Sequence, residues 1–177
     1  MRQNFADTLA IGGKSNSLGK ASEVIELVLK DESRLEELYA CLFNEDAWVR
    51  MRAADALEKV CRQRPGWLQP YVDRFFKDLA HNKQPSIQWH LAQIFRQVDL
   101  SNAQKRSATA WLKRLLTSIE VDWIVAANAM DTLAQFVKEG SVPRNELLAL
   151  LKVQQHHKSN SVVKRANKLL NELSNNN

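Results

Sequence analysis

Residues 46–60 read DAWVRMRAADALEKV, and three later segments repeat their spacing of apolar and small residues without an internal gap. These segments are QPSIQWHLAQIFRQV (84–98), DWIVAANAMDTLAQF (122–136) and SNSVVKRANKLLNEL (159–173). Their first apolar positions lie 38, 38 and 37 residues apart, at Val49, Ile87, Val125 and Val162. A constant period of this length is typical of solenoids, which stack one supersecondary unit on the next.

Within each segment the apolar positions share one helix face. In the first segment they are Val49, Ala53, Ala56, Leu57 and Val60, at i, i+4, i+7, i+8 and i+11. This spacing places them on one side of a helix with about 3.6 residues per turn. The small residues among them allow neighbouring helix backbones to approach closely. We therefore expect each segment to form a helix, the B helix of a repeat, with this face in the core.

An amphipathic stretch precedes every B segment, and we expect it to form the A helix of a helical hairpin. The four A helices are expected at 33–43, 67–80, 102–119 and 143–157, and a further helix at roughly 20–30. Pro65 and Gly66 mark the break before the second A helix. Pro70 falls in the first turn of that expected helix, where a missing amide hydrogen has no helical partner in any case.

Residues at the expected helix ends have a physical reason to stand there. Ser101 and Gln104 match a capping box that opens the third A helix. Asp46 and Asp122 stand where a B helix needs a side-chain acceptor for its first amides, and Gly140 favours termination of the third B helix. Alternating helices without strand-like alternation predict an all-α fold. We expect a right-handed α-α superhelix of about four helical hairpins plus an N-terminal capping helix.

Residues 44–57, NEDAWVRMRAADAL, resemble a HEAT repeat, with an acidic turn, then Val-Arg, then spaced Ala and Leu. The resemblance covers about residues 33–173 and is to a small, bacterial-type member of the HEAT (armadillo-type) α-solenoid family. It implies HEAT-like hairpins and a scaffold that grips a protein or peptide on the face lined by B helices. HEAT proteins often stack an Asp and Arg ladder between repeats. Here the Arg position reads Arg50, Gln88, Ala126 and Val163, so no charged ladder can run through the chain.

The expected domain organisation is a leader at residues 1–19, a single HEAT-like domain at 20–174 and a polar tail at 175–177. The leader contains IGGKS (11–15), which matches only the end of a phosphate-binding loop, because Thr8 stands where another glycine is needed. We interpret IGGKS as part of a flexible leader. The leader has no apolar core of signal-peptide length, and no stretch approaches the roughly 20 apolar residues of a membrane span. We expect a cytoplasmic protein.

The candidate binding surface is the side of the B helices opposite the core. Turning by about 100° per residue places Trp48, Met51 and Trp89 on this side. Aromatic residues, Met and Arg are enriched where proteins bind one another. The candidate binding residues are Trp48, Met51, Arg52, Trp89, His90 and Arg96. Two alternatives remain open: the helix phase differs by one residue, or a neighbouring loop covers the tryptophans.

The net charge of +5 is unevenly distributed. Residues 47–118 hold 13 basic and 5 acidic side chains, whereas residues 1–46 hold 5 basic and 9 acidic. A basic segment fits either a solvated helix surface or an anionic partner. Asp55, Glu58 and Asp131 interrupt the positive charge on the candidate surface, which suits a protein partner better than a phosphate backbone.

The function expected from these features is a non-enzymatic protein-binding scaffold or adaptor. One alternative is nucleic-acid binding, with a possible relation to the alkylpurine DNA glycosylases built from HEAT-like repeats, which place Trp, Asp and Arg in a concave groove. This chain is short for that family, and its catalytic motif cannot be matched to numbered positions. A second alternative is a structural subunit of a larger complex. The expected partner is a protein or peptide, with nucleic acid as the alternative.

No catalytic residue, metal site, small-molecule cofactor or membrane partner is expected. Cys41 and Cys61 lie among apolar residues of expected helices and are interpreted as small core residues, with a redox pair as the alternative. His156 and His157 are adjacent and diverge around a helix, so they do not meet one metal ion easily. His81 and His90 have no Cys or carboxylate at ligand spacing, and no Ser lies in a nucleophile elbow.

Overall fold

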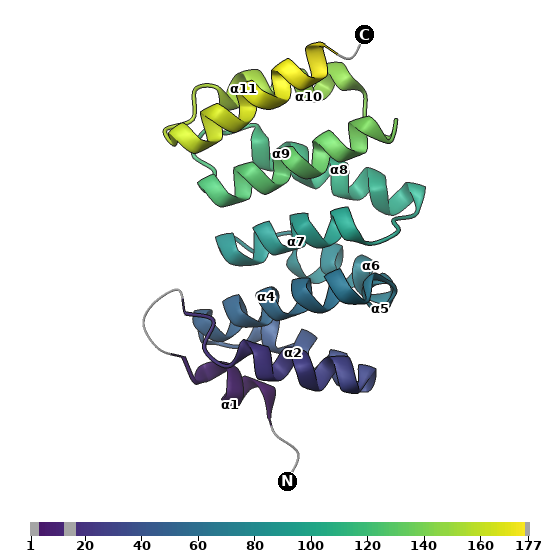
Figure 1. Ribbon diagram of the computed structural model, residues 1–177, viewed down its shortest axis with the longest axis vertical. Coiled ribbons are helices and arrows are strands. Elements are labelled where there is room, and N and C mark those ends of the chain that lie inside the picture. The colour runs from purple at the N-terminus through teal and green to yellow at the C-terminus, as the bar shows by residue number, and fades with distance from the viewer. Residues whose placement is uncertain (1–3, 13–16, 176–177) are drawn as a thin grey trace. The chain divides into compact units, whose positions relative to one another are not determined.

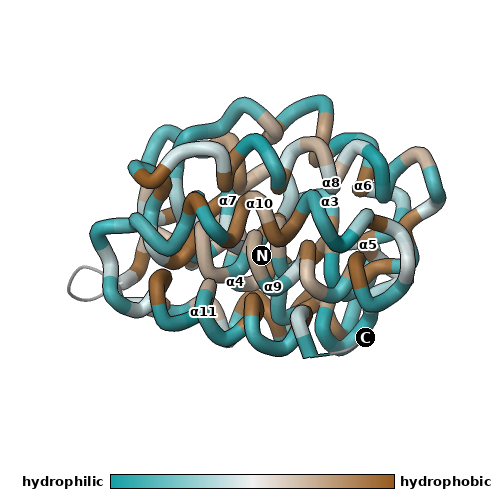
Figure 2. Tube along the Cα trace, turned by 90° about the horizontal axis from the view of Figure 1, so that it is seen from above, coloured by the Kyte–Doolittle hydropathy of each residue, from teal (hydrophilic) through white to brown (hydrophobic). Residues whose placement is uncertain are grey.

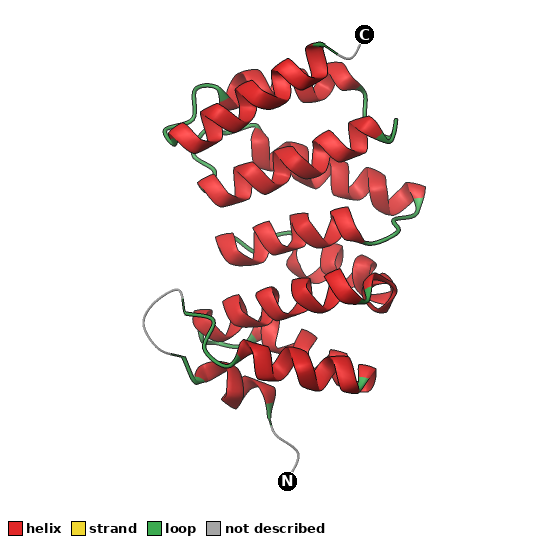
Figure 3. Ribbon diagram, viewed as in Figure 1, coloured by secondary structure: helices red, strands yellow, loops and turns green. Residues whose placement is uncertain are grey.

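The computed structural model describes residues 4–12 and 17–175, and most of these residues are helical (Figure 3). No strand occurs in this part of the chain, so the predicted all-α fold is confirmed. The handedness of the superhelix stays a prediction. The chain divides into two compact units. The first contains Met1–Tyr71 and Asn82–Asp99, and the second contains Val72–His81 and Leu100–Asn177.

The first unit is organised around one long helix, α4. Its helices are α1 (Phe5–Ala10), α2 (Ala21–Lys30), α3 (Leu35–Ala40), α4 (Ala47–Gln63), α5 (Pro65–Leu68) and α7 (Pro85–Gln97). Short 3₁₀ turns occur at Glu32–Arg34, Cys41–Phe43 and Gln69–Tyr71. Helix α4 packs against all the other helices of this unit, and α7 runs beside it (Figure 1). A helix contacted from so many directions has little surface left for solvent.

The second unit repeats the same kind of helical hairpin. Its elements are α6 (Val72–Arg74), a π-helical turn (Phe75–Leu79), α8 (Asn102–Leu116), α9 (Trp123–Lys138), α10 (Arg144–Gln154) and α11 (Asn160–Ser174). Helix α8 pairs with α9, and α10 pairs with α11. In addition, α8 contacts α10 and α9 contacts α11, so A helices stack on A helices and B helices on B helices. This is the packing expected of successive hairpin repeats.

The predicted core faces of the four B helices, α4, α7, α9 and α11, are confirmed. All anchor positions of the repeat are buried except Leu170, which is half-buried. Hydrophobic and hydrophilic residues alternate along the tube within the helices (Figure 2), as amphipathic helices require. The fixed register of the sequence repeat therefore corresponds to a fixed packing face.

The predicted capping residues are also confirmed. Ser101 and Gln104 make both hydrogen bonds of the capping box at the start of α8. The Asp46 carboxylate accepts the Trp48 backbone N–H at 2.7 Å, and the Asp122 carboxylate plays the same role at the start of α9. Gly140 follows α9 with a φ of 73°, a left-handed conformation that glycine adopts without strain. These contacts satisfy backbone groups that a helix end leaves without partners.

The second A helix differs from the prediction of one continuous helix at 67–80. The helix starts earlier, at Pro65, and α5 ends at Leu68. Pro70 therefore lies beyond the first turn, where its ring conflicts with a carbonyl one turn back and its nitrogen cannot donate. The chain passes through a 3₁₀ turn at Gln69–Tyr71 before helical structure resumes at Val72.

Helix α1 lies inside the segment expected to be a leader, and the sequence pattern did not predict it. Phe5 and Leu9 of α1 are fully buried. Helix α1 contacts α2, α3 and α4, while α2 contacts α4. The expected capping helix at 20–30 is α2, and α1 joins it as a short A-like helix. The interpretation of IGGKS as a flexible leader concerns mainly residues outside the described ones, since 13–16 are not described.

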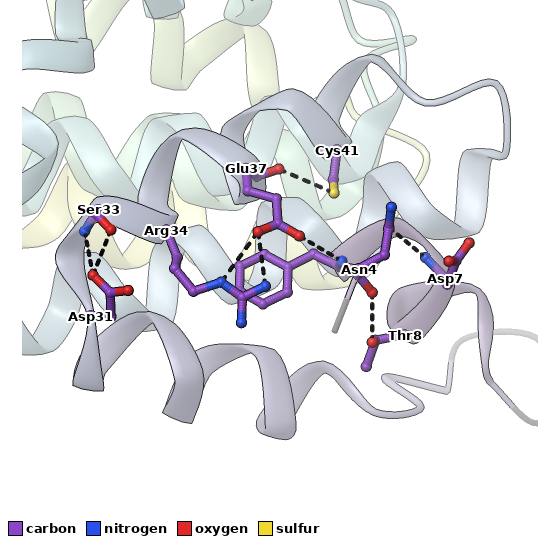
Figure 4. A network of polar contacts seen from close by, with 9 residues as sticks. Asn4, Asp7, Thr8, Asp31, Ser33, Arg34, Glu37 and Cys41 are labelled. Carbon is purple, nitrogen blue, oxygen red and sulfur yellow. Dashed lines mark hydrogen bonds and ion pairs between the residues drawn. The ribbon is translucent and has the colours of Figure 1, made fainter. Parts of the chain in front are cut away.

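Polar contacts hold α1 against α3 (Figure 4). The Glu37 carboxylate accepts the Phe5 backbone N–H at 2.9 Å and the Arg34 guanidinium at 2.8 Å. The same guanidinium lies over the Phe5 ring, 3.8 Å from its centroid. Asn4 caps α1 by accepting the Asp7 backbone N–H. A helix of six residues is too short to persist alone, so these contacts and the buried side chains must hold it in place.

Candidate functional site

An open pocket of about 320 Å³ lies between the N-terminal parts of α4 and α7. Its lining residues are Ala47, Trp48, Arg50, Met51, Gln84, Pro85, Ser86 and Trp89. The pocket lies entirely within the first unit. It brings together Trp48, Met51 and Trp89 of the predicted binding residues, because the register of the repeat places the starts of α4 and α7 side by side.

The tryptophans form the apolar part of this pocket. The Trp48 side chain is 40% exposed in the first turn of α4. Trp89 is half-buried on α7, and its ring centroid lies 5.2 Å from that of His90. Met51 is 9% exposed and contributes a flexible, polarizable wall. Among the described residues, neither indole N–H has a hydrogen-bond acceptor. The pocket thus combines apolar surface with available donors.

Arg50 connects the first repeat to the next at the side of the pocket. Its Nε donates to Gln84 Oε1 at 2.7 Å, and its Nη1 donates to the backbone carbonyls of Asn44 and Glu45 at 2.7 and 2.8 Å. Gln84 in turn donates to the Ala47 carbonyl and to the Ser86 hydroxyl. The guanidinium is therefore held in a fixed position.

The contact between Arg50 and Gln84 has a recognisable origin in the repeat. Gln84 occupies the register position of Asp46 and Asp122, the acidic position at the start of a B helix. A neutral amide thus meets the arginine where an Asp and Arg ladder would place a carboxylate. Arg50, Gln84 and Ser86 were not among the predicted site residues. The register of Gln84 was the signal that could have found this pair.

The charge of Arg50 consequently lacks a counter-charge. No carboxylate pairs with Arg50 among the residues that the structure describes, and no acidic residue lines the pocket. Its nearest acidic neighbours in sequence are Glu45 and Asp46, which are exposed. Asp46 directs a carboxylate oxygen to the Trp48 amide. The pocket is therefore apolar with one cation at its side.

The prediction that Met51, Asp55 and Glu58 face solvent is wrong. Every residue from Met51 to Glu58 is buried. The physical reason is the position of α4, which packs against α1, α2, α3, α5 and α7 instead of against helices on one side only. The helix phase was correct, since the predicted core face is buried, but the opposite side of α4 is covered as well.

Arg52 does not belong to the pocket, and its predicted place on the exposed surface is also wrong. Its side chain is 3% exposed. The guanidinium donates from Nη1 to the Leu9 carbonyl at 2.6 Å and from Nε to the Ser17 carbonyl at 2.9 Å. Gly12 lies so close that a Cβ on it would be 1.8 Å from Nη2. Arg52 therefore holds the N-terminal segment against α4.

His90 and Arg96 lie on α7 outside the pocket lining. His90 is 7% exposed, and its Nδ1 lies 3.1 Å from Gln93 Oε1. Burial lowers the pKa of His90, against the opposing effect of the Asp55 and Glu58 carboxylates. Arg96 is half-buried. Neither residue therefore lines the pocket, although the His90 ring packs against that of Trp89.

The acidic residues that interrupt the positive charge on the candidate surface form ion pairs within their own units. Asp55 pairs with Lys59 at 2.8 Å, and Glu58 pairs with Arg62 at 2.7 Å. Asp131 pairs with both nitrogens of the Arg165 fork, at 2.6 and 2.5 Å. These carboxylates neutralise cations that a phosphate backbone would need, which weighs against the nucleic-acid alternative.

The two cysteines are buried, and their thiols have raised pKa values. Burial raises the pKa of the Cys41 thiol to about 11 and that of Cys61 to about 12, and the neighbouring Glu37 and Glu58 carboxylates add to the respective effects. Both cysteines are reduced and buried. No group of three or more His, Cys, Asp and Glu side chains in the described ranges could hold a metal ion.

None of the described helices combines the length and apolar character that crossing a bilayer requires.

Stacked helical hairpins with A-on-A and B-on-B packing define a solenoid of the repeat class. A family model for the HEAT repeat domain matches residues 13–107, and the chain belongs to the HEAT-repeat family. The resemblance inferred from residues 44–57 is thus confirmed, and the pocket lies within the matched region. No curated protein and no solved structure matches the chain.

Proposed function

We propose that this chain is a non-enzymatic protein-binding scaffold or adaptor, and that it binds a segment of its partner in the pocket between α4 and α7. The observation that carries the proposal is the open pocket formed by Trp48, Met51 and Trp89. HEAT repeats commonly mediate protein interactions, which supports a binding role for this family member.

Energetic considerations favour a peptide or protein segment at this pocket. A tryptophan that becomes fully desolvated at an interface is a frequent hot spot, and its truncation costs about 2 kcal/mol or more. Trp48 has 40% of its surface available for such burial. The neighbouring Trp89 and Met51 already pack against the repeat, so a ligand need not order them first. A pocket formed in advance avoids part of the entropic cost of binding.

The test compares two variants of the full chain. The first carries Trp48→Ala and Trp89→Ala, which remove the apolar walls of the pocket. The control carries Trp123→Ala, which removes a more exposed tryptophan, 51% accessible, from the start of α9. Circular dichroism and thermal denaturation establish that both variants fold. Arg52 was also predicted to bind the partner, but its replacement is unsuitable as a test of binding, because Arg52 holds the N-terminal segment.

The measurement is affinity capture with nuclease treatment, followed by quantification of the retained proteins by mass spectrometry. We expect a partner that the wild type and the Trp123→Ala control retain equally and that the pocket variant loses. The proposal is wrong if a folded pocket variant retains every partner of the wild type. Partners that disappear on nuclease treatment would instead support nucleic-acid binding. The cytoplasmic location and the domain boundaries at 19/20 and 174/175 stay predictions.

A further inference from the structure

We infer that the pocket between α4 and α7 recognises an acidic peptide segment in which a bulky apolar side chain stands beside a carboxylate. This inference rests on the proposed function and specifies the chemistry of the partner. The apolar side chain would enter between Trp48 and Trp89, and the carboxylate would bind Arg50.

The size and lining of the pocket set the first requirement. Its volume of about 320 Å³ is at the lower end of the range for small-molecule sites, which is about 300–1,000 Å³. A space of this size accommodates one or two side chains. Trp48, Met51 and Trp89 present apolar surface to it, so a leucine, isoleucine or phenylalanine side chain gains free energy by leaving water there.

The charge of the lining sets the second requirement. Among the described residues, Arg50 is the only charged one in the lining, and no carboxylate of theirs pairs with it. Its Nε and Nη1 are used by Gln84 and two backbone carbonyls, whereas Nη2 has no hydrogen-bond partner among the described residues. A guanidinium fixed in this way can bind a carboxylate without a further loss of side-chain freedom.

The hydrogen-bonding groups agree with this charge preference. The indole N–H groups of Trp48 and Trp89 are donors without described acceptors, and a carboxylate or a peptide carbonyl can accept from them. A basic peptide would place like charges together at Arg50. A phosphate backbone gains most of its affinity from several cations, and this pocket offers one. An acidic, apolar peptide is therefore the occupant that matches both its surface and its charge.

The direct test uses three synthetic peptides that differ in one property each. The probe has the sequence Asp-Glu-Leu-Phe-Asp-Glu, with blocked termini and a fluorescent label. The second peptide replaces its acids by Asn and Gln, and the third replaces Leu-Phe by Ala-Ala. Fluorescence anisotropy with the full chain measures the dissociation constants. We expect each replacement to weaken binding at least about tenfold, because the first removes charge-assisted hydrogen bonds to Arg50 and the second removes the buried apolar side chains.

Three further measurements test where and how the peptide binds. The indole N–H signals of Trp48 and Trp89 should shift on addition of the probe, whereas that of Trp111 should not, because it already donates to the Ala80 carbonyl at 3.0 Å. Arg50→Gln should weaken the acidic probe about tenfold and leave the Asn and Gln peptide unchanged. The control is Arg64→Gln, an exposed arginine outside the pocket. A salt titration of the wild type gives a second test that does not depend on the folding of Arg50→Gln. Added salt should weaken binding of the acidic probe, because it screens the charge of Arg50.

A random-peptide display selection separates failure of this inference from failure of the proposed function. The selection is performed on the wild type and on the Trp48→Ala, Trp89→Ala variant. Enrichment of acidic, apolar peptides on the wild type alone supports the inference. Enriched peptides that depend on the tryptophans but carry no acidic residue overturn the inference and leave the proposed function standing. If the selection yields no tryptophan-dependent peptide, both the inference and the proposed function are wrong. In a separate assay, displacement of the probe by a single-stranded oligonucleotide at matched ionic strength would overturn the assignment to an acidic peptide.

Discussion

The guanidinium of Arg52 donates a hydrogen bond of 2.6 Å to the backbone carbonyl of Leu9, a residue 43 positions earlier in the chain. Because Arg52 is 3% exposed, its charge is separated from bulk water. Backbone carbonyls of Leu9 and Ser17 take the place of water around it. A side chain that the sequence suggested as a binding residue thus fixes the N-terminal segment to the centre of the first unit.

Replacement of Arg52 by methionine should release the N-terminal segment. The substitution keeps an apolar stem but removes the donors to the Leu9 and Ser17 carbonyls. We expect a loss of about 2–4 kcal/mol in the free energy of unfolding, because hydrogen bonds to charged groups contribute about 1.5–3 kcal/mol each. Hydrogen exchange of the α1 amides should accelerate more than that of α7. Equal protection of α1 in the variant and the wild type would contradict this role of Arg52.

Gly12→Ala should disturb the same contact from the opposite side. A Cβ on Gly12 would lie 1.8 Å from Arg52 Nη2, and this guanidinium cannot move freely because carbonyls hold it. We expect a destabilisation of about 1–3 kcal/mol, the usual cost of overpacking. The matched control is Gly66→Ala, because a Cβ there meets no atom within 4 Å. Chemical denaturation of both variants gives the comparison, and equal stabilities would show that the guanidinium can yield.

The burial of His90 should make stability depend on pH. Its folded-state pKa lies below the ordinary value of 6.5, chiefly because of desolvation. Asp55 and Glu58 act in the opposite direction, and Lys59 acts with burial. The unfolded state therefore binds the proton more readily, and stability should fall as the pH decreases through 6.5 toward the folded-state pKa.

The His90→Gln variant checks this assignment. It has no titrating group at this position, so its free energy of unfolding should decrease less than that of the wild type over the same pH range. Denaturant titrations at a series of pH values measure the difference. A parallel pH dependence in both proteins would mean that other groups cause it.

The cysteine thiols should be unreactive in the native protein. With pKa values of about 11 and about 12, at most about one thiol in a thousand is ionised at pH 8, and the thiolate is the reactive form. An aromatic disulfide reagent should therefore modify Cys41 and Cys61 only at the rate of unfolding. Addition of denaturant should expose both thiols at once. Rapid modification of either cysteine in native buffer would be inconsistent with the burial of both.

Much of the fold could be predicted from the sequence, because the constant spacing of the repeat shows which positions are equivalent in the four helices. The positions equivalent to Val49 recur in all four segments, and a helix face with so constant a spacing has one way to pack. Capping residues such as Asp46 and Ser101 fixed several helix boundaries, since their side chains act on neighbouring amides. Local chemistry and periodicity were enough for these features.

Other features depended on contacts that periodicity does not contain. Helix α1 has only six residues and is stabilised by Glu37 and by the burial of Phe5. The break at Pro70 depended on where the helix started, which differed by two residues from the expected position. The burial of Arg52 depended on α1, so it could not be inferred while α1 was missing.

The candidate site was predictable in its apolar part only. Trp48, Met51 and Trp89 were selected because of their helix positions, and the structure brings them to one pocket. The repeat pattern identified Arg50 only as the one charged residue at the ladder position, and it predicted no role for Gln84. Their contact crosses 34 positions of sequence, so it follows from the stacking of two repeats and not from either repeat alone.

The burial of Phe5 and Leu9 has a consequence for assembly. Without α1, the outer sides of α2, α3 and α4 would present an apolar end to water, and a repeat protein with an uncovered end tends to add another chain there. Helix α1 therefore covers apolar surface of α2, α3 and α4 to which another chain could otherwise bind. A chain shortened to begin at α2 should form concentration-dependent oligomers, joined end to end where α1 is absent.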